Sequence, residues 1–455
     1  MGNDDPGGLT IQTIQFVHRP LQKRHYTILM KNLLLLPVLV CTPTYYIGQN
    51  AGQPETKYRN DYGEEYAIQL TKDDAAKAVL QEARYHLRND AFSINKTSLI
   101  FDLAHNPYYL VELSPIGFGI YNPAVGDITQ LCPATNSPKC NGYTELFFVP
   151  TYGFVLRSKS GGYSNFHTGC LLNQKTVDSL TDKSASYYRS TIDEARETNF
   201  VPRTSIKMNA DEELTTVPHS SQRVFSDYYV NVDHHIDYDW YFRLNSDCHP
   251  TNTGVICGYV AASLVLGYLE IFKSSGYFSS SESNSYISIH EGTRYPGSIY
   301  PWHGIPEISD SFPTAAWGNG IGTTMIWDVK DALSSFIGTK KTYSFYYYLN
   351  VFASPTDPID DGFPAIYMGN MPDYSGQFSG NIDHAVVIYG YSSVTDKLLV
   401  HFGYEDYSQV LMSKLGLFNC AGVLAVYNQS AHVHKAYFKT TVSNQYYCGC
   451  GALLS

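Results

Sequence analysis

The chain has 455 residues, 44% of them hydrophobic and 16% charged, so it is long enough for roughly two or three domains and too apolar for a disordered protein. A formal net charge of −11 gives no long-range attraction to phosphate backbones, and no Lys/Arg-rich stripe offsets it, which argues against nucleic acid as a partner. The 39 tyrosines occur in runs such as Tyr346-Tyr347-Tyr348, which are typical of half-exposed strands.

A short apolar run near the N-terminus has the layout of a secretory signal. Residues 30–32 (MKN) give a basic start, residues 33–40 are apolar, and Cys41 follows. The run is too short to cross a bilayer, so we expect no stable membrane span. We therefore expect a secreted or cell-surface protein in which residues 1–41 are an N-terminal extension with a signal-like segment, Cys41 being an alternative site of lipid attachment. The other interpretation of the run is a buried strand or helix end.

Nine cysteines are too few for a disulfide-built scaffold in a chain of this length. No CxxC pairs with another CxxC or with a histidine pair, so we expect no metal and no cofactor. Cys132 with Cys140, and Cys448 with Cys450, are candidates for local bridges. Residues 233–239 (DHHIDYD) carry metal-ligating side chains, but neighbours on an extended chain point to opposite sides, which favours a solvated loop.

Residues 60–172 predict a small α+β domain. A helix is expected at 71–87, where Thr71 and Asp74 resemble a capping box and apolar residues recur at i, i+4. Short strands separated by turn residues, typical of an antiparallel meander, are expected at 108–113, 117–121, 127–128, 144–149 and 152–156. Residues 173–222 are polar and nearly free of apolar periodicity, which predicts a linker or activation segment.

Residues 223–455 predict a second α+β domain. Residues 255–272 carry apolar or small side chains on every face, which is typical of a helix buried all round. A further helix is expected at 327–337, and strands at 343–351, 363–368, 384–391 and 398–404. Helices followed by consecutive strands, without alternation, favour an antiparallel sheet.

Cys257 stands where a turn-forming glycine, Gly254, precedes the buried helix, so its thiol is expected at a helix N-terminus. The helix dipole and the free backbone N–H groups there stabilise thiolate and lower a cysteine pKa from about 8.5 to roughly 3.5–7.5. The same N–H groups suit an oxyanion hole. Taken alone, a cysteine in this place is more often a core residue.

His384 opens a strand that is apolar on both faces, so its ring is expected near the core. A buried imidazole needs a partner for each nitrogen, and a thiolate is a partner that makes the ring act as base and acid in turn. A lone strand histidine is usually structural. A cysteine heading a helix together with a histidine heading a strand is a more specific sign of a nucleophile and its base.

The segments 257–262 (CGYVAA), 384–391 (HAVVIYGY) and 400–404 (VHFGY) together resemble the papain-fold bacterial cysteine peptidases, especially the streptopain-like group. Residues 109–121 (YLVELSPIGFGIY) are similar to the inhibitory propeptide of that group. The resemblance implies a papain-like domain, in which a buried helix bearing Cys257 packs on an antiparallel sheet bearing His384, preceded by a small propeptide-like domain. It also implies a zymogen that is cut near residues 190 to 230 and has its own propeptide as a partner.

One position departs from that family. Where the family places an asparagine before a Trp-Gly-Trp element, this chain has His401 before Phe402 and Gly403. A neutral imidazole accepts from the His384 ring in only one tautomer, so His401 is the candidate third catalytic residue and a Cys-His dyad is the alternative. Relatives of papain use a glutamine ahead of the cysteine at the oxyanion, whereas this chain offers Thr251 and Asn252; we take Asn252, whose amide can donate.

The sequence therefore predicts a secreted cysteine-type peptidase that hydrolyses protein or peptide substrates through a Cys257–His384 acyl-enzyme. Two alternatives stay open. The first is a transglutaminase-like acyltransferase of the same fold, in which an amine replaces water as acceptor. The second is a non-catalytic secreted papain-fold protein that only binds.

Overall fold

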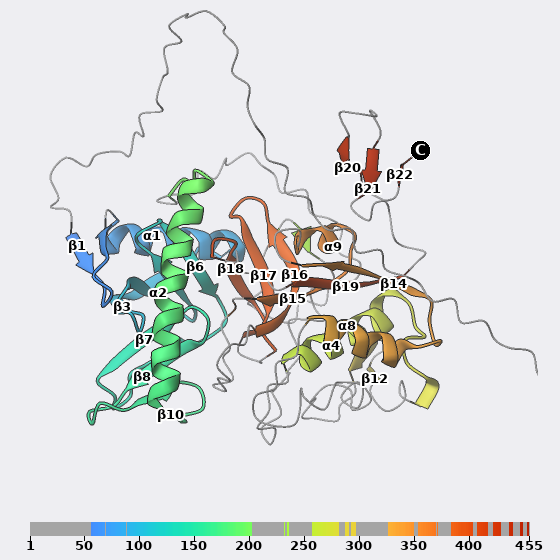
Figure 1. Cartoon of the computed structure of the whole chain (residues 1–455), viewed down its shortest axis with the longest axis horizontal. Coiled ribbons are helices and arrows are strands. Elements are labelled where there is room, and N and C mark those ends of the chain that lie inside the picture. Colours follow the sequence, from blue (N-terminus) through green and yellow to red (C-terminus); the bar gives the residue numbers. More distant parts are fainter. Residues whose placement is uncertain are drawn as a thin grey trace, which may run out of the picture. The chain divides into compact units, whose positions relative to one another are not determined.

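The computed structural model describes residues 56–68, 70–87, 89–202, 232, 234–235, 257–281, 287–290, 293–296, 326–349, 354–369, 371, 384–403, 407–416, 422–428, 436–439, 446–448 and 453–454 (Figure 1). All of them belong to one of two units of the chain, Pro54–Ser455. We call residues 56–202 the front half and the described residues from 232 onward the back half. The expected signal-like extension 1–41 lies outside the described residues, as do Asn252, Cys450 and residues 203–222.

The helices are α1 (Lys72–Leu87), α2 (Gln174–Glu197), α4 (Cys257–Tyr268) with a π-helical turn η1 (Leu269–Lys273), α8 (Ile326–Ile337) and α9 (Thr356–Asp360). The front-half strands are β1 (Thr56–Arg59), β2 (Glu65–Ile68), β3 (Ser93–Phe101), β4 (Pro107–Ser114), β5 (Phe118–Asn122), β6 (Asp127–Cys132), β7 (Glu145–Val149), β8 (Gly153–Arg157), β9 (Tyr163–Asn165) and β10 (Leu171–Leu172). The back-half strands are β11 (His234–His235), β12 (Ile287–His290), β13 (Thr293–Pro296), β14 (Tyr343–Tyr348), β15 (Ala365–Gly369), β16 (His384–Ser392), β17 (Lys397–His401), β18 (Val410–Ser413), β19 (Gly422–Asn428), β20 (Ala436–Lys439), β21 (Tyr446–Cys448) and β22 (Leu453–Leu454).

The first helix of the front half forms as expected. The Thr71 backbone N–H donates to Asp74 Oδ2 at 2.9 Å, and the Asp74 N–H donates back to Thr71 Oγ1 at 3.2 Å, which is the reciprocal pattern of a capping box. Ala75, Val79 and Ala83 are fully buried on one face of α1. This face packs on the meander formed by β4, β5 and β6, so the expected antiparallel strands of the front half are confirmed.

The expected linker at 173–222 is wrong over its first half, because residues 174–197 form α2, a helix of 24 residues. Asn173 caps it, accepting the Thr176 backbone N–H at 2.9 Å. The buried face of α2 combines a few large side chains with small polar ones at helical spacing: Val177, Leu180, Ser184, Ala185, Tyr187, Tyr188, Thr191 and Ile192. Serine, threonine and charged residues give the segment its polar composition, although Ser184 and Thr191 are buried on the helix face whose Tyr188 and Ile192 pack on the sheet.

Asp102 lies in the turn between β3 and β4 and is fully buried. Burial raises the pKa of its carboxyl to about 7, against N–H donors from Asn106 and Ala104 that lower it. In the unfolded chain the carboxyl has its ordinary pKa of 3.8. Between pH 3.8 and about pH 7 the carboxyl is therefore protonated in the folded chain and ionised in the unfolded chain. Stability gained from the raised pKa is present below about pH 4 and is lost as the pH rises towards 7.

We therefore expect the free energy of unfolding, measured by urea titration at a series of pH values, to fall between about pH 4 and pH 7. The Asp102→Asn variant removes the titrating group, so its curve is expected to be flatter by a few kcal/mol over this range. A fall of equal size in the variant would show that other groups cause it.

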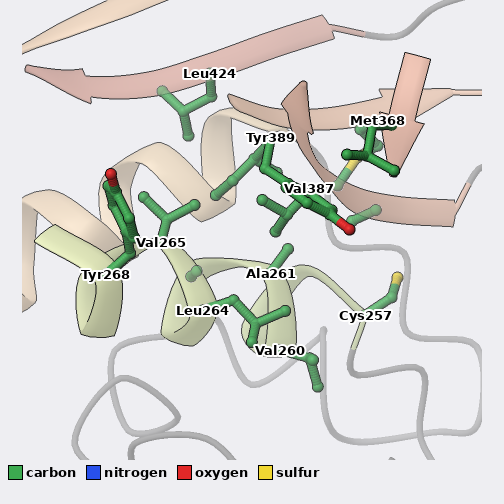
Figure 2. Close-up of a cluster of buried hydrophobic side chains, with 14 of the residues drawn as sticks. Cys257, Val260, Ala261, Leu264, Val265, Tyr268, Met368, Val387, Tyr389 and Leu424 are labelled. Atoms are coloured by element: carbon green, nitrogen blue, oxygen red, sulfur yellow. The ribbon is translucent and has the colours of Figure 1, made fainter. Parts of the chain in front are cut away.

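The back half places two helices on one face of its sheet. Leu264, Val265 and Leu269 of the α4–η1 segment are fully buried, as the apolar sequence predicted, and α8 contributes Val329 and Leu333 to the same core. Figure 2 shows α4 facing the strands, with Val387, Tyr389 and Leu424 of the sheet directed towards it. Among the described residues, no helix is long and apolar enough to cross a membrane.

Within the described part of the chain, 15 strands from both halves form one mixed, mostly antiparallel sheet. Its order is β10-β9-β8-β7-β3-β4-β5-β6-β18-β17-β16-β15-β19-β14, with β11 paired to β16. The fold is therefore α+β with a large antiparallel sheet, as expected. The pairing of β11 also means that His234 and His235 are part of a strand, where the sequence favoured a solvated loop.

The expected bridge between Cys132 and Cys140 is wrong, because both cysteines are free. Cys132 is fully buried in β6, where the Gln130 side-chain amide donates to its sulfur at 3.3 Å. Burial raises the pKa of the Cys132 thiol, so it stays protonated. The strand carries this side chain into the core, and nearness in sequence does not bring the two sulfurs together.

Candidate active site

Cys257 is the first residue of α4 and is 7% exposed. It belongs to the same apolar cluster as Met368 and Ala385, which lie on neighbouring strands of the back-half sheet. Figure 2 shows its side chain at the end of the helix, on the side where Met368 lies. The first-turn N–H groups of a helix have no partner within that helix, so this position offers both dipole and donors to a negatively charged sulfur or oxygen.

His384 is the first residue of β16, pairs with Gly369 of β15, and is 2% exposed. Its Nε2 lies 3.0 Å from the backbone carbonyl oxygen of Phe402, and its ring stacks on the Phe402 ring with centroids 5.9 Å apart and planes 9° apart. A carbonyl oxygen only accepts, so Nε2 carries the proton. In the neutral ring, Nδ1 therefore bears the lone pair, which assigns the tautomer that a base needs.

Phe402 and Gly403 form the turn that follows β17, which we call the corner, and the backbone N–H of each donates a hydrogen bond. The Phe402 N–H donates to Tyr407 O at 2.9 Å, and the Gly403 N–H donates to His401 Nδ1 at 2.9 Å. The His401 ring is fully buried, and this hydrogen bond places the proton of its neutral form on Nε2. The corner is thus fixed by backbone and imidazole contacts, and its carbonyl is aimed at the His384 ring.

The same corner touches the helix that carries Cys257. Gly403 has a φ of +87°, and a Cβ placed on it would lie 3.2 Å from Val260 Cγ1, one helical turn after Cys257. Only glycine combines this backbone conformation with so close an approach. The corner therefore links the first turn of α4 to the His384 ring.

We expect Gly403→Ala to lower the free energy of unfolding by about 1–3 kcal/mol, through the strained φ and the contact with Val260. Gly142→Ala is the matched control, because Gly142 has the same φ of +87° and no atom within 4 Å of a built Cβ. Urea titration is expected to show a larger cost at Gly403, and adding Val260→Ala is expected to reduce the difference. Equal costs at the two glycines would mean that the contact with α4 contributes nothing.

The residues expected from the sequence have different outcomes. Cys257 and His384 lie on α4 and β16, which share one core. His401, which was expected to accept from the His384 ring, lies at the end of β17, and the acceptor described at His384 Nε2 is Phe402 O. Asn252 lies outside the described residues. The carbonyl of Phe402 was missed because every residue has one; the glycine that follows it was the only available signal of a special backbone position.

A loop of the front half reaches the back of this corner. Asn165 Oδ1 accepts the backbone N–H groups of His167 and Thr168, both at 2.8 Å, and so fixes the loop. His167 Nε2 lies 3.4 Å from the Tyr407 hydroxyl, and the two rings meet edge to face with centroids 5.3 Å apart. The Tyr407 backbone carbonyl accepts the hydrogen bond of the Phe402 N–H. The front half therefore contacts a residue that stabilises the corner.

Among the residues that the structure describes, no group of three or more His, Cys, Asp or Glu side chains is placed to hold a metal ion. The groups described around the corner are a thiol at a helix N-terminus, an oriented imidazole and backbone donors.

Comparisons with known proteins give distant similarity. No protein-family model matches the chain, and no curated protein matches it. Among solved structures, the chain is similar to a fragment of Prevotella intermedia prointerpain A, with 13% sequence identity and a TM-score of 0.28 over 72% of this chain and 98% of that one. At this level the comparison records a distant structural likeness to a bacterial cysteine peptidase precursor and assigns no activity to this chain.

Proposed function

We propose that the chain is a cysteine peptidase in which Cys257 is the nucleophile and His384 the base. The observation that supports this most is the buried His384 ring, held through Nε2 by Phe402 O, at a corner that lies against the first turn of the Cys257 helix. The bond to Phe402 O fixes the tautomer with the lone pair on Nδ1, and the place of the ring beside a helix that begins with a cysteine favours the role of a base. The three elements supply nucleophile, base and orienting acceptor.

In the proposed reaction, His384 Nδ1 takes the proton of the Cys257 thiol, and the thiolate attacks the carbonyl carbon of the scissile peptide. The developing oxyanion is stabilised by backbone N–H groups at the start of α4. The C–N bond then breaks as His384 returns the proton to the leaving amine, which leaves a thioester on Cys257. Water, deprotonated by Nδ1, hydrolyses this acyl-enzyme.

The Phe402 carbonyl is the orienting group in this proposal. It holds one ring orientation and stabilises the imidazolium through its partial negative charge, without titrating itself. His401 then supports the corner through the Gly403 N–H rather than contacting the reacting atoms. Asn252 stays the predicted side-chain donor to the oxyanion.

We further propose that the protein acts outside the cytoplasm, as residues 30–41 suggest, and that it is made as a zymogen whose front half is the propeptide-like part. Amino-terminal sequencing of protein recovered outside the cell tests the first point, since removal of the signal-like segment leaves a start near residue 41. An unprocessed N-terminus on a protein confined to the cell would contradict it.

The peptidase itself is tested with casein and with an epoxide thiol probe. New amino termini released from casein, together with probe mapped to Cys257, support hydrolysis. Incorporation of a labelled amine without new termini would favour the acyltransferase. An intact fold with neither activity nor labelling would leave a protein that only binds.

A further inference from the structure

The two halves of the chain meet at a strand pair. Strand β6 of the front half runs antiparallel to β18 of the back half, with Leu131 opposite Leu411 and Gln130 opposite Met412. Without this partner, β18 would be an edge strand with unpaired backbone groups, a state that proteins usually cover. The seam between β6 and β18 is therefore part of the sheet ladder itself.

Apolar cores cross this seam on both faces of the sheet. On one face, Leu131 and Leu411 belong to the cluster that includes α1 and α4. On the other face, Cys132 and Met412 belong to the cluster that includes α2. All four side chains are at most 2% exposed, so separation of the halves would bring apolar surface from both faces into water.

A buried ion pair joins the halves beside the seam. Lys397 Nζ of β17 lies 2.6 Å from Asp127 Oδ1 of β6, and the two side chains are 1% and 3% exposed. The Ser413 hydroxyl donates to the other oxygen of Asp127. A buried charge without its partner is strongly unfavourable, so loss of either side chain while the halves stay joined is expected to destabilise the junction.

Both helices of the front half add contacts to the back half. On α2, Glu194 Oε2 accepts the Gly416 N–H at 2.7 Å, and a Cβ on Gly416 would lie 2.6 Å from the Tyr187 ring. On α1, the fully buried His86 has its Nε2 3.0 Å from Thr395 Oγ1. Contacts between the halves are therefore made by helices on both faces of the sheet.

We infer that the surface formed by β17 and β18 is a lasting docking site whose partner is the front half, residues 56–202, and that a cut in the connector 203–231 leaves the two pieces bound to each other. Cutting the connector then frees a chain end without removing the front half. The loop at His167 stays beside Tyr407 as well. This inference concerns association and does not rest on the proposed peptidase activity.

The test uses the full chain with Cys257→Ala, which prevents self-cleavage, and a site-specific protease sequence flanked by Gly-Ser inserted in the connector. After cleavage, a denaturing gel is expected to show two pieces, while size-exclusion chromatography shows one particle with the elution volume of the intact protein. Two separate peaks in plain buffer would overturn the inference. Co-expression of the two pieces as separate chains, with a tag on one, is expected to give a one-to-one complex and answers the same question without a protease.

A variant series then identifies the ion pair as part of the docking site. In the cut protein, Asp127→Ala is expected to lower the urea concentration at which the pieces separate, because it leaves Lys397 unpaired. Asp193→Ala is the matched control, since it breaks only the exposed pair with Arg196 inside α2. Replacing both partners, Asp127→Leu with Lys397→Met, is expected to restore binding and guards against a single variant that fails to fold. Equal separation midpoints for Asp127→Ala and Asp193→Ala would overturn the role of the pair.

Discussion

Replacing Cys257 by alanine is expected to abolish hydrolysis of casein, with a loss in kcat on the order of 10⁴-fold or more. In the proposed reaction the Cys257 thiol forms the acyl-enzyme, and backbone donors alone leave little rate enhancement. The fold is expected to persist, because alanine fits a helix and the lost sulfur burial costs only about 1 kcal/mol. The melting temperature of the variant, compared with that of the unmodified chain, tests whether the fold persists.

Cys257→Ser is the matched control for this prediction. Serine keeps the size and suits a helix start, but its hydroxyl is a far weaker nucleophile at neutral pH than a thiolate. Both variants are therefore expected to be inactive and folded, and neither to react with an epoxide probe. Activity retained in Cys257→Ala would rule out Cys257 as the nucleophile, and activity lost together with the fold would show that the residue is structural.

His384→Ala is expected to lower kcat by roughly 10²–10⁴-fold, the usual contribution of a general acid–base, with a smaller change in KM. The ring supplies the proton transfer at Nδ1, and nothing else on β16 replaces it. The tautomer is an independent measurement: nitrogen NMR of the histidine rings in the unmodified chain is expected to show His384 protonated on Nε2. A proton on Nδ1 of the neutral ring would contradict the role of Phe402 O.

His401→Ala separates positioning from chemistry. The described hydrogen bond of His401 is to the Gly403 backbone N–H of the corner. Loss of its ring is therefore expected to lower kcat roughly 10-fold, the usual effect of removing a residue that supports a reacting group. His401→Asn, which keeps a side-chain acceptor, is expected to recover part of that loss. Equal losses for His384→Ala and His401→Ala would instead make His401 a full catalytic member.

Local sequence was sufficient to predict the helices that have capping residues or a continuous apolar face. The capping residues Thr71 and Asp74 and the i, i+4 apolar face fixed α1 before any tertiary contact was considered. The run of apolar and small residues after Cys257 likewise predicted α4 as a buried helix. These signals are local, because the buried residues of a helix recur every three or four positions in the sequence.

Composition misled where small polar side chains are buried. In α2, Ser184 and Thr191 are buried although both count as polar, so the segment resembled a connector. The strand β18 was missed for a related reason, since its four residues are too few to show a period before a partner is known.

The sequence by itself determined which residues bring chemistry: a cysteine at a helix start and a histidine at a strand start. The tertiary structure decided what holds them. The acceptor for His384 is a backbone carbonyl, which no residue type reveals, and it is aimed by a corner that Gly403 fits against α4. The junction of the halves likewise joins residues that are far apart in the chain, such as Asp127 and Lys397. Such pairs are chosen by the packing of the whole sheet, because local patterns specify which face a strand buries but not which strand lies beside it.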